Sequence, residues 1–372
     1  FEKGATGFGI TPDAVWYLAM IHSYARLGNA AKSESWLERL EKDMAPSVEA
    51  VEGVINAWAQ QGDIAKAEFW FAQLLAKGLQ PSTFSYTAVI QACTKQGDGF
   101  SAERWLNKMI EDGLTPEAIS YSGVISAFAR HGSRAKDREN ALAWLNLLEK
   151  EGLPADTKSY TTVIAVYAKV GDFATAESLL GRMVEKGHSP DVVSYTAVID
   201  ACAKGGREAA AATYLEQMVQ QGLSPNERTF TAVIDASAKR GDSDQAERML
   251  ERMADQRLSP DLICYNTVIR SYARQGDISG ALRRLNSMLD QKVMPDVISF
   301  TPIIMEVSNM KASSEVRTGI IGKIFERMIQ LRVKPDRVLL PRLNSALGKA
   351  YVAQKCEGLL EVVKKRSVGA PV

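Results

Sequence analysis

A period of 35 residues constrains the fold of this chain more than any other feature of its sequence. The stretch SYTAVIDACAKGG at residues 194–206 returns as TFTAVIDASAKRG at residues 229–241. Alignment on the aromatic residue and the Val-Ile pair that follows gives nine consecutive repeats. We place them at 14–47, 48–82, 83–117, 118–156, 157–191, 192–226, 227–261, 262–296 and 297–336. Because such a period is typical of repeat architectures, the sequence predicts one elongated array in place of separate domains.

Each repeat has the pattern of two helices. In the first helix, apolar residues recur at spacings of three and four, which is typical of a helix with one face in a core. This helix ends at a glycine, which adopts the left-handed conformation, and the next side chain caps the second helix. The pairs are Gly62-Asp63, Gly97-Asp98, Gly171-Asp172, Gly241-Asp242 and Gly276-Asp277, with Gly28-Asn29 and Gly132-Ser133 as variants. The second helix ends before a proline, which cannot continue a helix. These prolines are Pro12, Pro46, Pro81, Pro116, Pro154, Pro190, Pro225, Pro260, Pro295 and Pro335.

A single helix pair of this size cannot bury its apolar face, so neighbouring pairs must stack. The predicted fold is therefore an all-α, right-handed α-solenoid with an extended concave surface. We expect the extra residues of the fourth and ninth repeats, around 133–140 and 309–316, in a loop between the two helices. Residues 1–13 are interpreted as the end of a truncated upstream repeat. Residues 337–372, with Pro341 in place of the usual Thr, are interpreted as a degenerate C-terminal capping repeat.

The composition argues against several classes of function. The 45 basic and 44 acidic residues give no bulk attraction to nucleic acid, so any such binding requires local placement of charge. The four cysteines form no CxxC pair, and the three histidines have no acidic or cysteine neighbour at ligand spacing. No uninterrupted apolar run reaches the length of a membrane span. We expect no metal, no cofactor, no small-molecule substrate and no membrane insertion.

The repeat VVSYTAVIDACAKGGREAAAATYLEQMVQQGLSPN closely resembles the pentatricopeptide repeat of the P class, and the resemblance extends from about Ala14 to Asp336. The tetratricopeptide repeat differs, because its period is about 34 residues and its first helix has a W…LG…Y pattern that is missing here. The resemblance implies a protein that binds single-stranded RNA in a chloroplast or a mitochondrion, with one base per repeat. We expect the chain to be a fragment whose transit peptide lies upstream.

The resemblance also implies that the fifth and the last residue of each repeat select the base together. The pairs are Leu18/Ser47, Glu52/Ser82, Thr87/Glu117, Ser122/Asp156, Thr161/Asp191, Thr196/Asn226, Thr231/Asp261, Asn266/Asp296 and Thr301/Asp336. Guanine and uracil carry a ring N–H that suits a carboxylate, whereas adenine and cytosine offer a bare ring nitrogen that suits an amide donor. In the family, Thr or Ser at the fifth residue prefers purines and Asn prefers pyrimidines. Repeats four to nine then predict 5′-GGAGUG-3′, read from the protein's N-terminal side.

The first three repeats fit this scheme less well. Thr87/Glu117 predicts a weaker purine preference. Repeats one and two are not expected to read a base, because Leu18 has no polar atom and Glu52 would repel a phosphate.

Two further sets of residues are assigned to RNA by the same resemblance. The thirteenth residue, which contacts phosphate in the family, is basic in seven of nine repeats. This set is Arg26, Gln60, Lys95, Arg130, Lys169, Lys204, Lys239, Arg274 and Asn309. The second residue, which lies between bases in the family, is Val15, Glu49, Phe84, Ile119, Lys158, Val193, Arg228, Ile263 and Ile298. A structural explanation also exists, since an Asp caps a helix and a cation in the last turn complements the helix dipole.

The favoured function is sequence-specific binding of single-stranded RNA in organellar RNA processing, stability or translation, without catalysis. The deaminase and metallonuclease signatures that some family members carry do not occur in this sequence. The alternative is a protein-interaction scaffold or a structural subunit of a large organellar assembly, which the net charge of +1 also fits. A preference for one oligonucleotide over a scrambled one would separate the two functions.

Overall fold

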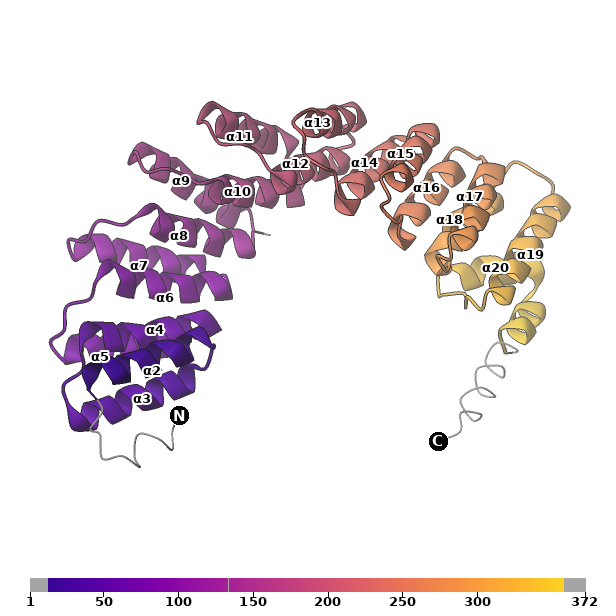
Figure 1. The fold of residues 1–372 in the computed structure, drawn as a ribbon. Helices are drawn as coiled ribbons and strands as arrows, with labels where there is room; N and C mark the ends of the chain where they lie inside the picture. The colour runs from indigo at the N-terminus through magenta and orange to yellow at the C-terminus, as the bar shows by residue number, and fades with distance from the viewer. Residues whose placement is uncertain (1–12, 133, 358–372) are drawn as a thin grey trace. The chain divides into compact units, whose positions relative to one another are not determined.

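The computed structural model describes residues 13–132 and 134–357. Within these ranges the chain forms α-helices joined by short turns and contains no β-strand (Figure 1). The chain divides into two compact bodies, Phe1–Ser194 and Tyr195–Val372, and the boundary lies inside α12 (Val192–Lys204). In each body the helices pack as consecutive pairs, so each body is a stretch of α-solenoid. The all-α solenoid that the period predicts is thus confirmed.

One pair of helices belongs to each repeat. The first helices are α2 (Ala14–Arg26), α4 (Val48–Gln61), α6 (Thr83–Gln96), α8 (Ala118–Arg130), α10 (Thr157–Lys169), α12, α14 (Glu227–Arg240), α16 (Leu262–Arg274) and α18 (Val297–Asn309). The second helices are α3 (Ala30–Asp43), α5 (Ile64–Ala76), α7 (Gly99–Glu111), α9 (Ala135–Lys150), α11 (Phe173–Glu185), α13 (Glu208–Gln220), α15 (Ser243–Asp255), α17 (Ile278–Asp290) and α19 (Ser314–Gln330). The ninth repeat is followed by α20 (Leu339–Leu347), and residues 349–357 are also helical. Each first helix begins at the residue at which its repeat was placed.

The Gly-Asp turns form in most repeats. Gly62, Gly97 and Gly241 end their first helices in the left-handed conformation, with φ of 79°, 76° and 85°. The following residue then caps the second helix, as where the Asp63 carboxylate accepts a hydrogen bond from Lys66 N at 3.0 Å. Because these signals are local in the sequence, the boundary between the two helices is predictable without knowledge of the tertiary structure.

The fourth and ninth repeats depart from the predicted turn. Their second helices, α9 and α19, have 16 and 17 residues, whereas most second helices have 13. Most of the extra residues therefore lengthen a helix, and the expectation of a longer loop is wrong. In the fourth repeat the extra segment contains KDREN at residues 136–140, in which Lys, Arg and Glu favour a helix. The helix begins after Arg134 without a side-chain cap, and Ser133, the predicted cap, lies outside the described residues.

The first helices form a continuous layer within each body. In the N-terminal body α2, α4, α6, α8 and α10 pack in order, each against the next, and in the C-terminal body α14, α16, α18 and α20 do so. A second helix packs against its own first helix and against the first helix of the following repeat, as α5 does with α4 and α6. Equivalent residues of successive first helices therefore lie in rows with one residue per repeat.

The fourth residue of each repeat is a buried aromatic residue on the first helix, except in the second repeat, where it is Val51. Tyr86 of α6 is 1% exposed, and its hydroxyl donates to the carboxylate of Asp112, directly after α7. Tyr160 of α10 is fully buried and donates to Glu149 of α9, the second helix of the preceding repeat. Burial of one such side chain contributes about 1.5–3 kcal/mol. Since Thr87 and Thr161 directly follow these tyrosines, the core fixes the position of the predicted base-selecting residues.

Candidate nucleic-acid interface

The two residues predicted to select a base, here called selectors, come together although about 30 residues separate them. In most repeats the last residue caps the first helix of the next repeat, as Asp296 caps α18, and α18 packs against α16, which carries the fifth residue Asn266. In the eighth repeat Asn266 Nδ2 donates to Asp296 Oδ1 at 3.1 Å. In the second repeat Ser82 Oγ donates to Glu52 Oε1 at 2.5 Å. Stacking of the first helices therefore creates the pairs.

The selectors differ in their accessibility. Among the fifth residues, Thr161 and Asn266 are 9% exposed and Thr196 is 4% exposed. Half-buried fifth residues are Thr87, Ser122, Thr231 and Thr301. The last residues are more open: Glu117, Asp156, Asn226 and Asp261 are exposed, whereas Asp191, Asp296 and Asp336 are half-buried. An approaching base therefore contacts the last residue of a repeat first and the fifth residue second.

A further residue, which the sequence reasoning missed, connects the two selectors. In the fourth repeat Ser159 Oγ lies 2.8 Å from Ser122 Oγ and 2.6 Å from Asp156 Oδ1. Ser159 is the third residue of the following repeat, and it directly precedes the buried aromatic residue. We call the residues at this place bridging residues: Ser85, Ser120, Ser159, Ser194, Thr229, Cys264 and Ser299. Their signal was present in the sequence as a recurring Ser, Thr or Cys before the aromatic residue.

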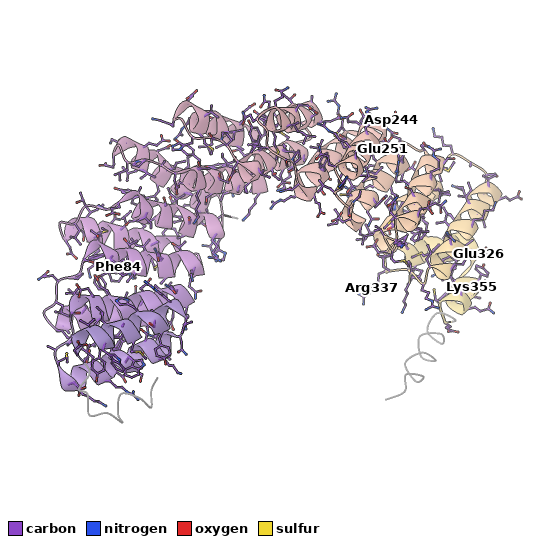
Figure 2. The ribbon with its side chains drawn as sticks, viewed as in Figure 1. Phe84, Asp244, Glu251, Glu326, Arg337 and Lys355 are labelled. Carbon is purple, nitrogen blue, oxygen red and sulfur yellow. The ribbon has the colours of Figure 1, made fainter. Side chains whose placement is uncertain are left out.

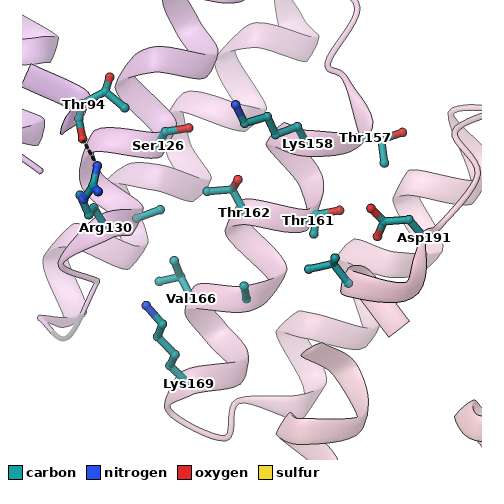
Figure 3. Close-up of a pocket in the computed structure, with 13 residues that line it drawn as sticks. Thr94, Ser126, Arg130, Thr157, Lys158, Thr161, Thr162, Val166, Lys169 and Asp191 are labelled. Atoms are coloured by element: carbon teal, nitrogen blue, oxygen red, sulfur yellow. Dashed lines mark hydrogen bonds between the residues drawn. The ribbon is translucent and has the colours of Figure 1, made fainter. Parts of the chain in front are cut away.

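A cavity of about 730 Å³ in the N-terminal body brings the four predicted sets of residues together (Figure 3). Its lining includes the second residues Lys158 and Val193, the selectors Thr161 and Asp191, and the thirteenth residues Arg130 and Lys169. Carboxylate, hydroxyl, apolar and cationic groups thus converge on one space. This combination suits a flat polar ring that carries an anionic group.

Thr161 is unusual among the fifth residues. Its Oγ1 is buried and has no hydrogen-bond partner. Ser194, the bridging residue at this place, bonds to Asp191 instead, with Ser194 Oγ 2.9 Å from Asp191 Oδ1. The side chains of Thr161 and Asp191 face each other in Figure 3. A buried hydroxyl without a partner costs about 1–3 kcal/mol, so the cavity favours a ligand with a complementary polar group.

The thirteenth residues contact the neighbouring repeat. Lys95 donates to Gln60 O, and Lys239 Nζ donates to Ala203 O at 3.1 Å. Arg130 Nη1 donates to Thr94 O at 3.2 Å (Figure 3). These acceptors are carbonyls in the last turn of the preceding first helix, where a cation complements the helix dipole. The structural explanation therefore accounts for part of this set.

Two of the predicted phosphate contacts are also paired with carboxylates. Lys204 Nζ lies 2.9 Å from Asp200 Oδ2, and Lys239 Nζ lies 2.7 Å from Asp235 Oδ2. Each pair is four residues apart on one helix, so the motifs DACAK and DASAK contained this signal. The row of cations is consequently less positive in the sixth and seventh repeats than the sequence reasoning implied.

The second residues are mostly exposed and apolar. Val193, Ile263 and Ile298 are 57%, 61% and 59% exposed. Phe84, which Figure 2 labels, is 48% exposed, and Arg228 is exposed as well. Solvent-facing apolar side chains at one per repeat have the accessibility that contact with base faces requires.

The second repeat differs from the sequence expectation. Glu52 was expected to repel a phosphate, but the residue is only 8% exposed. Ser82 Oγ and Ser85 Oγ both donate to its Oε1 at 2.5 Å. The carboxylate therefore serves as an internal acceptor. In the first repeat Leu18 is half-buried and offers no polar atom.

The remaining candidate chemical groups lie in structural places. Cys93 and Cys202 are fully buried core residues, as predicted. His131 Nε2 lies 3.0 Å from Gln96 O, and the His188 ring packs beside Tyr160. In residues 13–132 and 134–357, no three His, Cys, Asp or Glu side chains are grouped to hold a metal ion. No helix within the described ranges is long and apolar enough to span a membrane.

Stacked helix pairs, with a polar selector pair in every repeat but the first, define an α-solenoid repeat protein. Comparison with protein families gives three matches: the PPR repeat family at residues 81–130 and 155–204, the PPR repeat at 17–43, and the pentacotripeptide-repeat region of PRORP at 199–332. These matches reach from residue 17 to residue 332. The chain belongs to the pentatricopeptide repeat family.

Solved structures of similar proteins include the pentatricopeptide repeat protein PPR10 from maize, at 21% identity and a TM-score of 0.41 over 98% of this chain. PPR10 in complex with an 18-nt psaJ RNA element gives 20% identity and a TM-score of 0.47 over 95% of this chain. The PPR domain of Arabidopsis thaliana protein-only RNase P 1 in complex with tRNA gives 18% identity and a TM-score of 0.43. That match covers 49% of this chain and 94% of the domain. The chain spans 65% and 60% of the two PPR10 chains. Comparison with curated proteins gave no match.

Proposed function

We propose that the protein binds single-stranded RNA sequence-specifically, with one base per repeat and 5′-GGAGUG-3′ as the preferred sequence of repeats four to nine. Membership of the pentatricopeptide repeat family supports this function. The observation that carries the proposal is the buried, unpartnered Oγ1 of Thr161, which lines a cavity together with Asp191.

The groups around this cavity suit a guanine nucleotide. The Asp191 carboxylate accepts a hydrogen bond from the ring N–H of guanine. The edge of the base also offers a partner to the Thr161 hydroxyl, which otherwise has none. Val193 and the stem of Lys158 contact the faces of the base. Arg130 and Lys169 lie where they attract the neighbouring phosphates. Each of these six groups then has a partner on the nucleotide.

A binding measurement with two oligonucleotides tests the proposal. The protein is titrated with a single-stranded RNA that contains GGAGUG and with a scrambled RNA of the same composition, at moderate salt. We expect much tighter binding of the first RNA. The Asn226→Asp variant should prefer guanine to adenine as the third base, because a carboxylate accepts where the amide donated. Equal affinity for both RNAs, or no binding, would overturn the proposal.

A second experiment tests the cavity itself. Thr161→Val keeps the shape of the side chain but removes the hydroxyl, and we expect it to weaken binding of the GGAGUG RNA by roughly 3- to 10-fold. Thr213→Val, on the exposed face of α13, is the matched control and should bind as the wild type does. If both variants bind like the wild type, Thr161 does not contact the base.

We further propose that the protein acts in a chloroplast or a mitochondrion, where it supports RNA processing, stability or translation. Tight occupancy of a transcript is sufficient to block a nuclease or to open a hairpin, so this role requires no catalytic group. Imaging of a fluorescent fusion to the complete natural chain would test the compartment. RNA crosslinking in that compartment would identify the bound transcripts. Enrichment in the cytosol would contradict the organellar role.

A protein-interaction scaffold is the second candidate function. The ion pairs Asp200–Lys204 and Asp235–Lys239 favour it, because they neutralise part of the predicted phosphate contacts. A scaffold predicts equal and weak affinity for the two RNAs above. It also predicts co-purification of the same protein partners after treatment with ribonuclease.

A further inference from the structure

We propose that the bridging residues are positioning residues for base selection. In this proposal, the hydroxyl at the third residue of a repeat determines which atoms of the two selectors in the preceding repeat donate hydrogen bonds and which accept them. Sequence specificity then depends on three residues per base, two of which contact the base and one of which lies beneath them. The inference rests on the proposed RNA binding.

Burial makes the bridging contacts persistent. Ser159 is 2% exposed, and Thr229 and Ser299 are fully buried. Water cannot replace the hydrogen bonds of such groups, so their partners must come from the protein. In all three cases these partners are the two selectors of the preceding repeat. The selectors are therefore held by an internal group and do not rotate freely at the surface.

The sixth repeat shows how one hydroxyl sets the direction of several hydrogen bonds. Asn226 Oδ1 accepts from both Thr229 N and Thr229 Oγ1, each at 3.0 Å. Because the single proton of Thr229 is used there, Thr196 must donate across the 2.7 Å contact between the two hydroxyls. The amide group of Asn226 is thus turned with its oxygen inward and its N–H groups outward. Outward N–H groups suit the bare ring nitrogen of adenine, the base predicted for this repeat.

The fourth repeat uses the same arrangement with a carboxylate. Asp156 Oδ1 accepts from Ser159 N at 2.8 Å and from Ser159 Oγ at 2.6 Å. One oxygen of the carboxylate is therefore engaged, and Oδ2 remains as the acceptor for an incoming N–H. This suits guanine, the predicted base.

In the eighth repeat the bridging residue orients the fifth residue. Ser299 Oγ donates to Asn266 Oδ1 at 2.6 Å, and Asn266 Nδ2 donates to Asp296 Oδ1 at 3.1 Å. The amide of Asn266 therefore cannot reverse without the loss of both bonds. One of its N–H groups stays free for a base.

The seventh repeat contains a natural variation. Its bridging residue is Cys264, and Thr231 Oγ1 lies 3.1 Å from the sulfur. Thr231 also donates to Glu227 O at 2.7 Å. A thiol is a weak donor and a weak acceptor, so this bridge constrains the selectors less than a hydroxyl does. The structure therefore assigns a lower base discrimination to the seventh repeat than to the fourth, sixth and eighth repeats.

Helix capping alone is the competing explanation, because the bridging residues also lie in the first turn of a helix. Capping predicts a loss of stability and an equal loss of affinity for every base. Positioning predicts a change of preference at one base only. The position of the affected base in the RNA therefore distinguishes the two explanations.

The first test removes a bridging hydroxyl. Thr229→Val is compared with Thr229→Ser in binding to GGAGUG RNA and to single-base variants, well below the melting temperature of each protein. We expect Thr229→Val to lower the preference for adenine over guanine at the third base by roughly 3- to 10-fold. The preference at the first base, which Ser122 and Asp156 read, should not change. Thr229→Ser should keep the wild-type preference.

The second test strengthens the contact made by a bridging residue. It predicts a gain in base preference, which a misfolded variant would not show. Cys264→Ser should raise the preference for guanine over adenine at the fourth base by roughly 2- to 5-fold and leave the other bases unchanged. The inference requires both shifts. An unchanged preference in either variant, or an equal loss at every base, overturns it. Failure of the wild-type protein to bind RNA would instead overturn the proposed function, and this inference with it.

Discussion

The Asp235 carboxylate lies 2.7 Å from the Lys239 ammonium on one face of α14, and it also lies 3.2 Å from Arg270 Nη2 of the next first helix. One acid therefore engages Lys239, which is a predicted phosphate contact, and a second cation, Arg270, which is not. The side chains of the three residues are between 29% and 42% exposed, so water and salt weaken the attraction. RNA must compete with an internal carboxylate in this part of the C-terminal body.

Removal of that competitor should strengthen RNA binding. We expect Asp235→Asn to raise the affinity for GGAGUG RNA by roughly 2- to 5-fold at low salt, since an exposed ion pair of this kind is worth up to about 1 kcal/mol. The dependence of affinity on salt should also become steeper, because a freed cation displaces additional counterions from RNA. Titrations at several salt concentrations measure both effects.

The matched control is Asp244→Asn, which makes the same change of charge at an exposed residue of α15 (Figure 2). It alters the net charge equally but breaks no ion pair with the thirteenth residues. If the two variants bind RNA alike, net charge and not local pairing controls the affinity.

Three basic residues occupy a backbone conformation that favours glycine. Arg257, Lys292 and Arg332 have φ of 59°, 60° and 61° after their second helices. Other repeats have a glycine with positive φ at the same place: Gly78, Gly113, Gly152, Gly187 and Gly222. Since the left-handed conformation costs a residue with a Cβ about 1–2 kcal/mol, these turns store strain.

Arg257→Gly should therefore raise the free energy of unfolding, by about 0.5–1 kcal/mol once the extra chain entropy of glycine is subtracted. Gly222→Ala is the reverse change at the equivalent place and should lower it by a similar amount. Urea unfolding at one pH measures both. A loss of stability in Arg257→Gly would show that contacts of the arginine side chain outweigh the backbone strain.

The repeat boundaries were predictable because their signals are local. A glycine that ends one helix, an acid that caps the next and a proline that stops it all act within a few residues. The same locality explains the error in the fourth and ninth repeats, where the helix preference of the extra residues outweighs the missing cap. In α9, residues 136–140 (KDREN) are helical although the Arg134 side chain makes no capping hydrogen bond.

The candidate site was only partly predictable because its contacts connect different repeats. Ser159 meets Ser122 across 37 residues, and only the packing of α10 on α8 brings them together. The burial of Glu52 depends in the same way on Ser82 and Ser85 of the neighbouring turn. By contrast, Asp235–Lys239 lies within one helix, and the sequence alone contained that pairing.

Thiol accessibility gives a direct test of the core. Cys93, Cys202 and Cys264 are fully buried, whereas Cys356 is half-buried. Burial raises the pKa of the Cys93 thiol to about 12 and that of the Cys264 thiol to about 11, so both stay protonated and unreactive at neutral pH. We expect iodoacetamide to modify Cys356 first in the native protein and all four cysteines in urea. Mass spectrometry of the digested protein measures this, and native labelling of Cys264 as fast as that of Cys356 would contradict the packing.

The contact between Tyr160 and Glu149 predicts a dependence of stability on pH. Burial alone would raise the pKa of the Glu149 carboxyl, but hydrogen bonds from Tyr160 and Arg182 outweigh burial and lower this pKa. Burial and the bond to Glu149 raise the pKa of Tyr160 to about 12. A carboxyl whose pKa is lowered on folding stabilises the protein above its unfolded pKa, about 4.3, and loses this effect as pH falls through the folded value.

Glu149→Gln should therefore destabilise the protein by about 1 kcal/mol at pH 7, and the difference from the wild type should shrink as the pH falls below about 4.3. Glu185→Gln, at an exposed residue of α11, is the control and should follow the wild type at each pH. Urea unfolding at several pH values gives the free energies. A constant difference between Glu149→Gln and the wild type would mean that the side chain acts through its shape alone. A difference that shrinks only in Glu149→Gln would establish that the charged carboxylate holds α9 to α10, and so fixes Thr161 beside Tyr160.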